Sequence, residues 1–351
     1  MCEAYIAKRD ATRENKWLEL ASENCNASVK INPDSAQVHV TLGAVYRRTN
    51  RVEEATKESN KALALDPSNA DGYTLLASIT AATGKEAEAE ALYKKAISVR
   101  RGDWTPYYRL GAFYLTRGRY NEAQQVSGQA LALAPDNTQV LENLGVIFIR
   151  KNDLNNAARV LKRSLDIRQD VFVYTNLGNV YLLQGNFKDV VPLWEKAAEL
   201  SPKDARMKGN LADIYRLTGR TGQAMAAYRQ AIELAVKDLT ASQLNARLRA
   251  ALATYYAHVG DKSKALEEIE RALSQAPQQV EVLFARVQVF ASVRELDRAL
   301  QALGDALRAG FPLEDVERDP DLAELRASPR YKEMVAPYSR GAVKSRENPK
   351  Q

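Results

Sequence analysis

Apolar residues in the stretch 171–204 recur with the spacing of two amphipathic helices. A first set lies at i, i+3, i+4 and i+7, on one helix face: Tyr174, Leu177, Gly178 and Tyr181. A second set lies at i, i+4 and i+7: Val190, Trp194 and Ala197. Gly185 separates the two sets and Pro202 follows the second, so each helix has a stop signal. The stretch therefore predicts a helix, a tight turn, a second helix and a break.

The core of this pattern recurs along the chain as a Leu, a small residue and, three positions later, an aromatic residue. Six complete copies begin at Leu42, Leu110, Leu144, Leu177, Leu211 and Leu252, and two degenerate copies begin at Leu76 and Arg286. Successive copies are 34, 34, 34, 33, 34, 41 and 34 residues apart. The predicted second helices share a small residue at one place, with Val190 as the exception: Ala55, Ala89, Ala123, Ala157, Ala224, Ala265 and Ala299. This period predicts an array of helical hairpins.

These residues and their period resemble the signature of the tetratricopeptide repeat (TPR) family. The resemblance covers roughly residues 2–310 and implies an all-α fold, a right-handed superhelical TPR solenoid of helix-turn-helix repeats. It also implies that the first helices line a concave groove that binds partner peptides. A closing block, DPDLAELRASPRYKEM, resembles the end of the TPR arrays of large bacterial signalling proteins, including membrane-associated serine/threonine kinases.

The repeat pattern divides the chain into four parts. Residues 1–35 are predicted to form a partial N-terminal TPR-like repeat with a truncated first helix, because the chain begins inside the pattern. This start indicates a fragment or a truncated relative of a larger protein. Eight repeats are predicted over 36–310, starting near 36, 70, 104, 138, 171, 205, 246 and 280. Residues 311–336 are predicted to be a C-terminal helical cap, and 337–351 a disordered basic tail.

Three departures from the pattern predict local differences. The 41-residue step places seven extra residues around 236–245, where the absence of Gly and Pro predicts longer helices rather than a loop. Arg286 replaces the core Leu of the last repeat, so that face is predicted to be partly open or capped. The turns share Gly or Asn, which tolerate a left-handed conformation: Asn50, Gly84, Gly118, Asn152, Gly185, Gly219 and Gly260. Arg294 stands there in the last repeat, whose turn is therefore predicted to differ.

Composition and motifs predict that the chain is not an enzyme. The 351 residues are 45% hydrophobic, and the net charge of +6 comes from interleaved charges rather than from a basic run. The sequence has no catalytic motif, phosphate loop, metal cluster or cofactor signature. His39 is interpreted as a packed core histidine, and His258 as complementing the C-terminus of its helix. Cys2 and Cys25 are interpreted as small buried residues, which suits a reducing compartment.

Polar residues of the predicted first helices form the candidate partner-binding groove. Asn143, Asn176 and Asn210 each precede the Leu-small pair, about 100° round the helix from the packed Leu. An amide can donate to and accept from a peptide backbone, and the series resembles the asparagine ladder of the O-linked N-acetylglucosamine transferase. The alternative is that Asn is a common framework residue at this place. The other groove candidates are Arg47, Arg48, Arg109, Asn179, Arg206, Asp213 and Arg216.

The predicted function is a protein–protein interaction scaffold that binds an extended partner peptide in this groove, as a sensor or docking region of a bacterial signalling protein. Arginines in a groove favour acidic partners. One alternative is the regulatory C-terminal part of a serine/threonine kinase. Another is an RNA-binding helical repeat, which the basic charge favours and the sparse aromatic residues disfavour. No apolar stretch approaches the ~20 residues of a membrane helix. The predicted location is cytoplasmic, or extracytoplasmic in a longer membrane-anchored parent.

Overall fold

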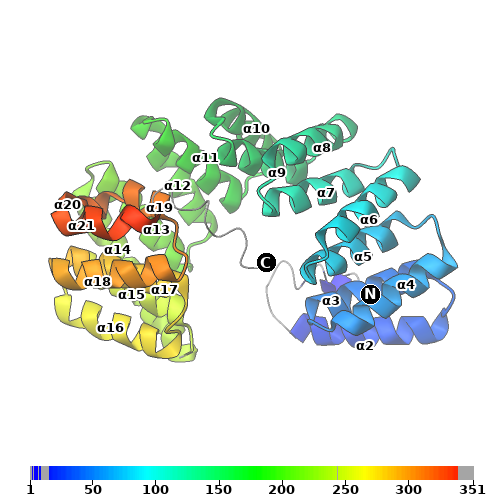
Figure 1. Ribbon diagram of the computed structural model, residues 1–351, viewed down its shortest axis with the longest axis horizontal. Helices are drawn as coiled ribbons and strands as arrows, with labels where there is room; N and C mark the ends of the chain where they lie inside the picture. The colour runs from blue at the N-terminus through cyan, green and yellow to red at the C-terminus, as the bar shows by residue number, and fades with distance from the viewer. Residues whose placement is uncertain (1, 3, 7, 9–15, 243, 339–351) are drawn as a thin grey trace, which may run out of the picture. The chain divides into compact units, whose positions relative to one another are not determined.

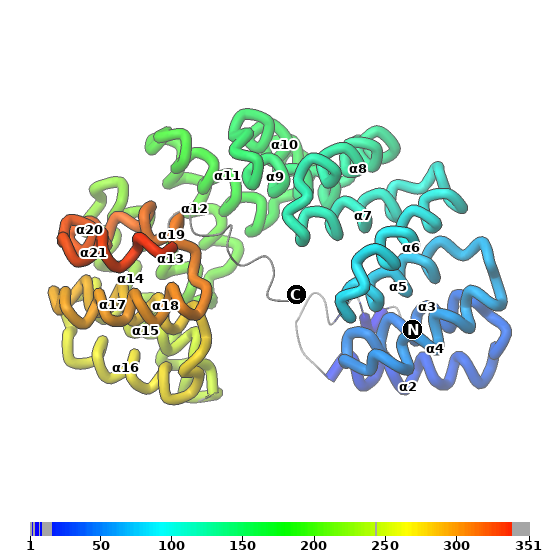
Figure 2. Tube along the Cα trace, viewed as in Figure 1, coloured from blue at the N-terminus to red at the C-terminus, as the bar shows by residue number. Residues whose placement is uncertain are grey.

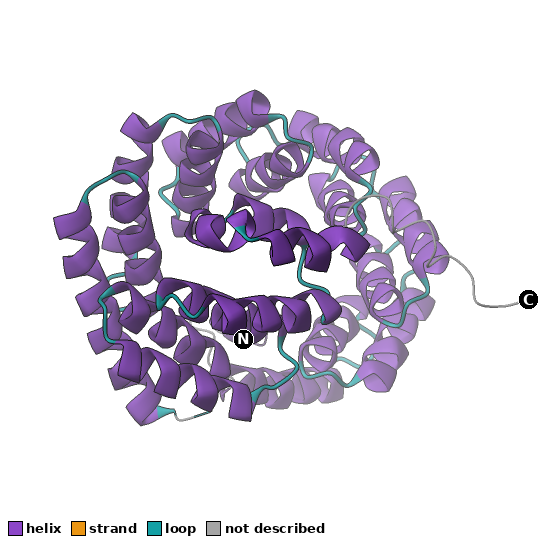
Figure 3. Cartoon of the chain, turned by 60° about the vertical axis from the view of Figure 1, so that its left-hand side comes forward, coloured by secondary structure: helices purple, strands orange, loops and turns teal. Residues whose placement is uncertain are grey.

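A computed structural model describes residues 2, 4–6, 8, 16–242 and 244–338 of the chain. The chain divides into two compact units, Met1–Gln169 and Asp170–Gln351, and each unit is described by itself. The described residues of both units form helices joined by short loops and include no strand (Figure 3). The predicted all-α solenoid of helix-turn-helix repeats is thereby confirmed.

The first unit consists of helical hairpins stacked in chain order (Figure 1). Helix α2 (Lys16–Ile31) precedes them. Four hairpins follow: α3 (Ala36–Arg48) with α4 (Val52–Leu65), α5 (Ala70–Ala82) with α6 (Glu86–Val99), α7 (Trp104–Thr116) with α8 (Tyr120–Leu133), and α9 (Thr138–Arg150) with α10 (Leu154–Ile167). The first helices α3, α5, α7 and α9 contact one another in succession and form an inner layer.

The second unit repeats this arrangement and ends in a different segment (Figure 2). Its hairpins are α11 (Val171–Leu183) with α12 (Phe187–Leu200), α13 (Ala205–Leu217) with α14 (Thr221–Ala241), α15 (Ala246–His258) with α16 (Lys262–Gln275), and α17 (Val280–Ser292) with α18 (Leu296–Arg308). The C-terminal segment, residues 311–338, contains α19 (Leu313–Arg318), η1 (Pro320–Leu322), α20 (Ala323–Ala327), α21 (Pro329–Val335) and η2 (Ala336–Tyr338). The predicted disordered tail lies, from residue 339 on, outside the described residues.

Side-chain caps determine where most of the first helices begin. The N-cap side chain accepts a hydrogen bond from a backbone N–H of the first turn, and the residues that do so are Ser35, Asn69, Asp103, Asn137, Asp170, Asp204 and Asn245. Each such bond satisfies a donor that has no partner within the helix and contributes about 1 kcal/mol. The short polar residues before the apolar stripes therefore mark the helix starts.

Small side chains allow the two helices of a hairpin to approach closely. The repeating alanines of the second helices are fully or almost fully buried: Ala55, Ala89, Ala123, Ala157, Ala224, Ala265 and Ala299. Gly178 shows how tight one of these contacts is, because a Cβ atom there would lie 2.5 Å from Nε1 of Trp194. Trp194 is itself buried, so the bulky ring and the missing side chain complement each other.

The insertion near residue 240 and the replacement of the core Leu by Arg286 each change the structure locally. The extra residues lengthen α14 to 21 residues, which confirms the longer helix. Arg286 remains about a quarter exposed, and its guanidinium lies 3.3 Å from the carboxylate of Asp305. Arg286 is therefore neither fully buried nor unpaired, in agreement with the predicted partly open or capped face.

The C-terminal segment packs against α17 and α18 through an apolar cluster of its own. Its buried members from the segment are Val316, Leu322, Leu325, Tyr331 and Val335. From the last hairpin, the buried Phe290 and Leu303 belong to the same cluster. The segment is thus anchored by burial of apolar side chains, independently of its polar contacts.

The structure corrects the interpretation of the two cysteines. Cys2 and Cys25 are buried, as predicted, but they form a disulfide with Cα atoms 5.3 Å apart. A Cα separation of this size is typical of disulfides. The cysteines are 23 positions apart, and this spacing gave no sign of the bond, because it depends on Cys2 packing against α2. The argument for a reducing compartment therefore has no support from these residues.

The predicted difference in the turn of the last repeat is wrong. Arg294 has a φ of 61°, the same left-handed conformation that Asn50 and Asn152 adopt in their turns. The N–H of Glu295 donates to the carbonyl of Phe290 at 2.8 Å, and Asp261 donates to Tyr256 in the equivalent turn. These bonds close the end of the first helix in the same way in both repeats, so the packing of the hairpin imposes the turn on Arg294.

Arg294→Gly is expected to raise the free energy of unfolding of the second unit by roughly 0.5–1 kcal/mol. A left-handed conformation costs a non-glycine residue roughly 1–2 kcal/mol, and the greater freedom of unfolded Gly offsets part of that gain. Thermal melting followed by circular dichroism measures the change. Gly260→Ala, in the equivalent turn at a φ of 84°, is the matched control and should lower the melting temperature. If Arg294→Gly melts no higher than the wild type, the left-handed conformation does not strain Arg294.

Candidate functional site

A groove of about 620 Å³ runs along the inner layer of the first unit. Its lining residues occupy the same places in α3, α5 and α7, counted from the core Leu of each repeat. They stand one residue before that Leu (Thr41, Leu75, Arg109), two after it (Ala44, Ser78, Ala112) or five after it (Arg47, Ala81). The register of the repeat thus decides which side chains reach the inner face.

The groove of the first unit carries an excess of positive charge. Four arginines line it, Arg47, Arg48, Arg109 and Arg117, and among the described lining residues the only acidic one is Asp71. Burial raises the pKa of the Tyr93 hydroxyl, which also lines the groove, and positive charges on Arg109, Arg47 and Arg117 oppose that rise. One of the four, Arg117, forms an ion pair with Glu86 at 2.6 Å. Arginine thus outnumbers acidic residues among the described lining residues of this groove.

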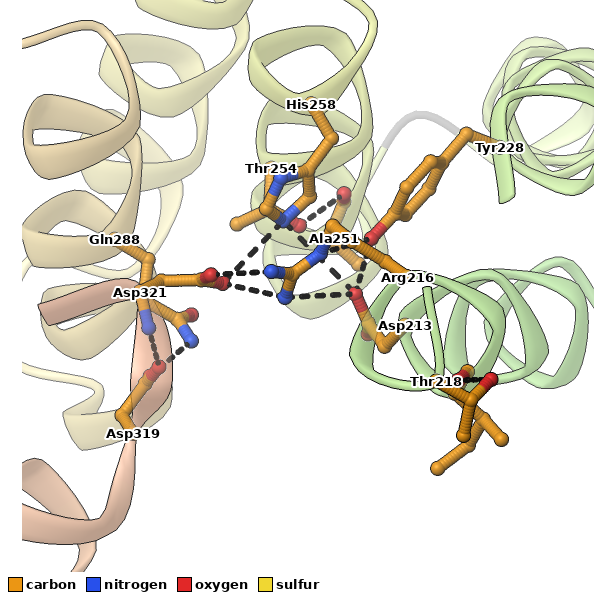
Figure 4. A network of polar contacts seen from close by, with 11 residues as sticks. Asp213, Arg216, Thr218, Tyr228, Ala251, Thr254, His258, Gln288, Asp319 and Asp321 are labelled. Atoms are coloured by element: carbon orange, nitrogen blue, oxygen red, sulfur yellow. Dashed lines mark hydrogen bonds and ion pairs between the residues drawn. The ribbon is translucent and has the colours of Figure 1, made fainter. Parts of the chain in front are cut away.

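In the second unit, an inner-face arginine already holds a carboxylate. Arg216, on α13, donates from both terminal nitrogens to the two carboxylate oxygens of Asp321, at 2.6 and 2.8 Å (Figure 4). Asp321 belongs to η1, 105 residues further along the chain. This bidentate geometry is the preferred arrangement of Arg with a carboxylate and is stronger than a single neutral hydrogen bond.

Three further side chains surround the Arg216–Asp321 pair (Figure 4). The Tyr228 hydroxyl, from α14, donates to Asp213 and accepts from Nε of Arg216 at 3.3 Å. The ring of His258, from α15, stacks on Tyr228 with the centroids 4.9 Å apart. Its Nε2 lies 3.8 Å from Asp321 and 3.9 Å from Asp213. The approach of His258 to Asp321 joins α15 to the C-terminal segment, and the other contacts join α13, α14 and α15 to one another.

A second carboxylate of the C-terminal segment meets the next first helix. Asp319 accepts a hydrogen bond at 2.9 Å from the side-chain amide of Gln288, on α17. Its other oxygen accepts from the backbone N–H of Asp321 at 2.9 Å, which fixes the position of η1. Arg326 donates to the backbone carbonyl of Asp319 and to that of Val316. Asp319 is therefore held by α17 and by contacts within the C-terminal segment, and Asp321 is held by Arg216.

Burial dominates the electrostatics of this network. It lowers the pKa of His258 to about 4, and the charge of Arg216 adds to the fall, so the imidazole is neutral at pH 7. It raises the pKa of Asp213 to about 6, although the hydrogen bond from Tyr228 and the charge of Arg216 oppose the rise. Burial also raises the pKa of Asp319. The interpretation of His258 as a helix-end residue is thus incomplete, because its ring lies in the network.

The predicted site residues fall into separate places. The structure brings Arg47, Arg48 and Arg109 together in the first groove, and Asp213 and Arg216 together in the network of the second unit. Arg206 is exposed and lines a pocket of about 580 Å³ beside α13 and α15. Asn179 and Asn210 are exposed. His39, as predicted, is a buried framework residue, bonded to Glu58 and to the Pro33 carbonyl.

Two of the predicted ladder asparagines have bonds within the chain. Asn143 accepts a hydrogen bond at 3.0 Å from the buried Ser127 hydroxyl of α8. Asn176 donates to the carbonyl of Phe172 at 2.8 Å, one turn earlier in its own helix. The bond to Ser127 is a framework contact of the kind that the alternative interpretation requires.

Sequence reasoning missed Asp321, Tyr228 and His258 as members of a site. His258 stands six residues after its core Leu252, as Arg48 does after Leu42, so its position in the repeat pointed to the inner face. No comparable signal existed for Asp321, which lies outside the repeats. Over the part of the chain that the structure describes, no His, Cys, Asp or Glu cluster could hold a metal ion. Within the same residues, none of the helices has the length and apolar character that crossing a membrane requires.

Comparisons with known proteins agree on one repeat family. Four sequence models, each described as tetratricopeptide repeat, match residues 40–103, 114–177, 171–237 and 246–289. No curated protein matches the sequence significantly.

Among solved structures, the Cut9–Hcn1 hetero-tetramer of APC/C matches with a TM-score of 0.50 and 19% identity over 87% of this chain. The chain spans about half (48%) of that protein's length. Human IFIT1 with m7Gppp-AAAA matches with a TM-score of 0.51 and 16% identity, covering 75% of this chain and 68% of IFIT1. A tetratricopeptide repeat protein from Parabacteroides merdae has a TM-score of 0.50 and 15% identity, covering 84% and 99%. At such identities the matches show the fold alone.

His258 predicts an acid-sensitive contribution to stability. Its pKa is about 4 in the folded chain and 6.5 ordinarily, so the unfolded chain binds more protons between these values and stability falls as pH falls. Asp213 has the opposite effect, because its raised pKa makes the folded chain bind the proton between about pH 4 and 6. Comparing wild type with His258→Gln isolates the contribution of His258, because Asp213 is present in both proteins. From pH 7 to pH 4.5, we expect wild type to lose roughly 2–3 kcal/mol relative to this variant, measured by urea unfolding. Equal pH profiles would contradict a buried neutral imidazole.

Proposed function

The chain belongs to the tetratricopeptide repeat family, a fold that serves as a scaffold for protein–protein interaction, and on this premise we propose that the groove of its first unit binds an extended acidic peptide of a partner protein. The single observation that carries the proposal is the groove itself, about 620 Å³, lined by three successive first helices and by four arginines. Repeats of this kind present continuous surfaces to extended ligands.

The dimensions of the inner layer suit a peptide strand. Packed helices lie ~8–10 Å apart, and an extended peptide advances ~3.3 Å per residue. About every third residue of the peptide would therefore meet a new first helix. The lining alternates arginines with small or apolar side chains such as Ala44, Leu75 and Ala112. Such a surface favours acidic residues interspersed with small apolar ones.

The second unit supplies an internal precedent for this chemistry. Arg47 stands five residues after Leu42, and Arg216 stands five residues after Leu211, so the two occupy the same repeat position. Arg216 binds both oxygens of an Asp carboxylate. We therefore assign to Arg47 the same role toward a carboxylate of the partner, with Arg109 contacting a second one.

The asparagines are a finer part of the proposal. We propose that Asn143 in the first unit, and Asn176, Asn179, Arg206 and Asn210 in the second, each contact the backbone of a partner peptide. The predicted signalling role, including that of the regulatory part of a serine/threonine kinase, is supported only by the resemblance of the block 319–334. That role stays a prediction.

Removing the two groove arginines tests the main proposal. The probe is a fluorescein-labelled 12-residue peptide of alternating Asp and Ala, with alternating Asn and Ala as the neutral reference, followed by fluorescence anisotropy. Arg47→Ala with Arg109→Ala is expected to weaken binding of the acidic peptide roughly 10- to 100-fold, because each charge-assisted hydrogen bond contributes about 1 kcal/mol or more.

Arg101→Ala with Arg159→Ala is the matched control. It removes the same charge from exposed positions outside the groove and should leave the affinity within about twofold. Equal losses in both double variants would contradict a groove site. A 12-nucleotide single-stranded RNA is the third probe. Tighter binding of RNA than of the acidic peptide, with a steep loss as salt rises, would favour the RNA-binding alternative and overturn the proposal.

The asparagines are tested by replacing Asn143, Asn176 and Asn210 together with Ala. If each holds the partner backbone, affinity for the partner should fall by about 3 kcal/mol, on the order of a hundredfold, and the melting temperature should fall only by the loss of the Asn143–Ser127 bond. The measurement pairs the binding isotherm with a melting curve on the same sample. A lower melting temperature with unchanged affinity would assign all three to the repeat framework, as the bond of Asn143 to Ser127 already suggests for one of them.

A further inference from the structure

We propose that the inner face of the second unit is a second binding site for acidic peptides, and that the C-terminal segment of the same chain closes it by inserting Asp321 as an intramolecular ligand. The site is separate from the groove of the first unit, and the proposal does not rest on binding there. Its ligand class is a short peptide with an Asp-x-Asp motif, the chemistry that Asp319 and Asp321 themselves present.

Three first helices contribute one side chain each to this site (Figure 4). Arg216 comes from α13, His258 from α15 and Gln288 from α17. They stand five, six and two residues after the core position of their repeats, and the equivalent places in the first unit line its groove, at Arg47, Arg48 and Ala44. The site is therefore built on the same inner-face register as the groove.

The contacts at this site are those of a bound ligand with its receptor. Arg216 donates hydrogen bonds to both carboxylate oxygens of Asp321, and the side-chain amide of Gln288 donates to Asp319 at 2.9 Å. Both acidic residues come from the short sequence Asp319-Pro320-Asp321, and Pro320 limits the number of conformations that this motif adopts. All the receptor residues belong to the repeats, whereas both ligand residues lie outside them.

The polar contacts are separable from the apolar anchor of the segment. Leu322, Leu325 and Val335 are buried in the cluster with α17 and α18, whereas Arg216 and Asp321 retain 31% and 17% of their side-chain exposure. A partly exposed ion pair of this kind contributes modestly to stability. A carboxylate supplied by another molecule can therefore replace Asp321 while the C-terminal segment stays folded on α17 and α18.

The covalent connection explains why the site is closed in the free chain. An intramolecular ligand acts at an effective concentration in the millimolar range, so a peptide of similar intrinsic affinity competes poorly. A partner that presents several carboxylates, or that also binds elsewhere on the chain, overcomes this competition. The segment thus restricts the second site to partners with more than one contact.

The test removes the internal ligand and keeps the anchor. The probe is the fluorescein-labelled, acetylated peptide Glu-Arg-Asp-Pro-Asp-Leu-Ala, the sequence of residues 317–323. Asp321→Ala is expected to bind this peptide at least tenfold more tightly than wild type. Glu324→Ala is the matched control, because it removes one negative charge from an exposed position of the same segment and should bind as wild type does.

Two further variants show where the gained binding occurs. Adding Arg216→Ala to Asp321→Ala should abolish the gain, and adding Arg47→Ala with Arg109→Ala should preserve it, so that failure here is distinguished from failure at the first groove. Asp321→Asn, which keeps the shape of the side chain, serves as a second variant if Asp321→Ala melts below the wild type. Equal binding by wild type and by both folded Asp321 variants, or a gain that survives Arg216→Ala, would overturn the proposal.

Discussion

The close contact between the two helices of each hairpin is the constraint on which the rest of the structure depends. Ala55, Ala89 and Ala123 are completely buried where the helices of three successive hairpins meet, and Gly178 leaves no room for a Cβ beside Trp194. A hairpin held at this distance exposes an apolar stripe that it cannot bury alone, so it must pack against its neighbours. The stacking of the hairpins follows from that need.

The stacking in turn determines which residues face inward. Within the first unit, the residues one before and two after the core Leu of α3, α5 and α7, and five after it in α3 and α5, line a single groove. These positions accept side chains of different chemistry, from Leu75 to Arg47 and Arg109. Two of them carry Arg, Arg47 and Arg109, and a guanidinium there can meet a planar carboxylate with two hydrogen bonds. The proposed binding of a partner peptide therefore depends on positions that the repeat pattern aligns along one face.

The C-terminal segment shows how an apolar anchor can position a polar contact. Burial of Leu322 and Leu325 against α17 and α18 holds η1 in place. Asp319 and Asp321 lie on either side of Pro320, and so this burial also carries both carboxylates to the inner face. The same arrangement explains the lowered pKa of His258, because the segment and the helices around it withdraw this imidazole from water.

The sequence by itself determined the fold class, the repeat family and the lengthened α14, because each of these depends on periodic local patterns that a single chain displays. It also pointed to Arg47, Arg109, Asp213 and Arg216, since position within the repeat predicts the direction of a side chain. Only the tertiary structure decided the partners: Asp321 for Arg216, Ser127 for Asn143, and Cys25 for Cys2. It also decided the left-handed turn at Arg294, where local preference alone predicts a different turn. Contacts between residues distant in sequence depend on how separate elements pack, and helical periodicity carries no information about that packing.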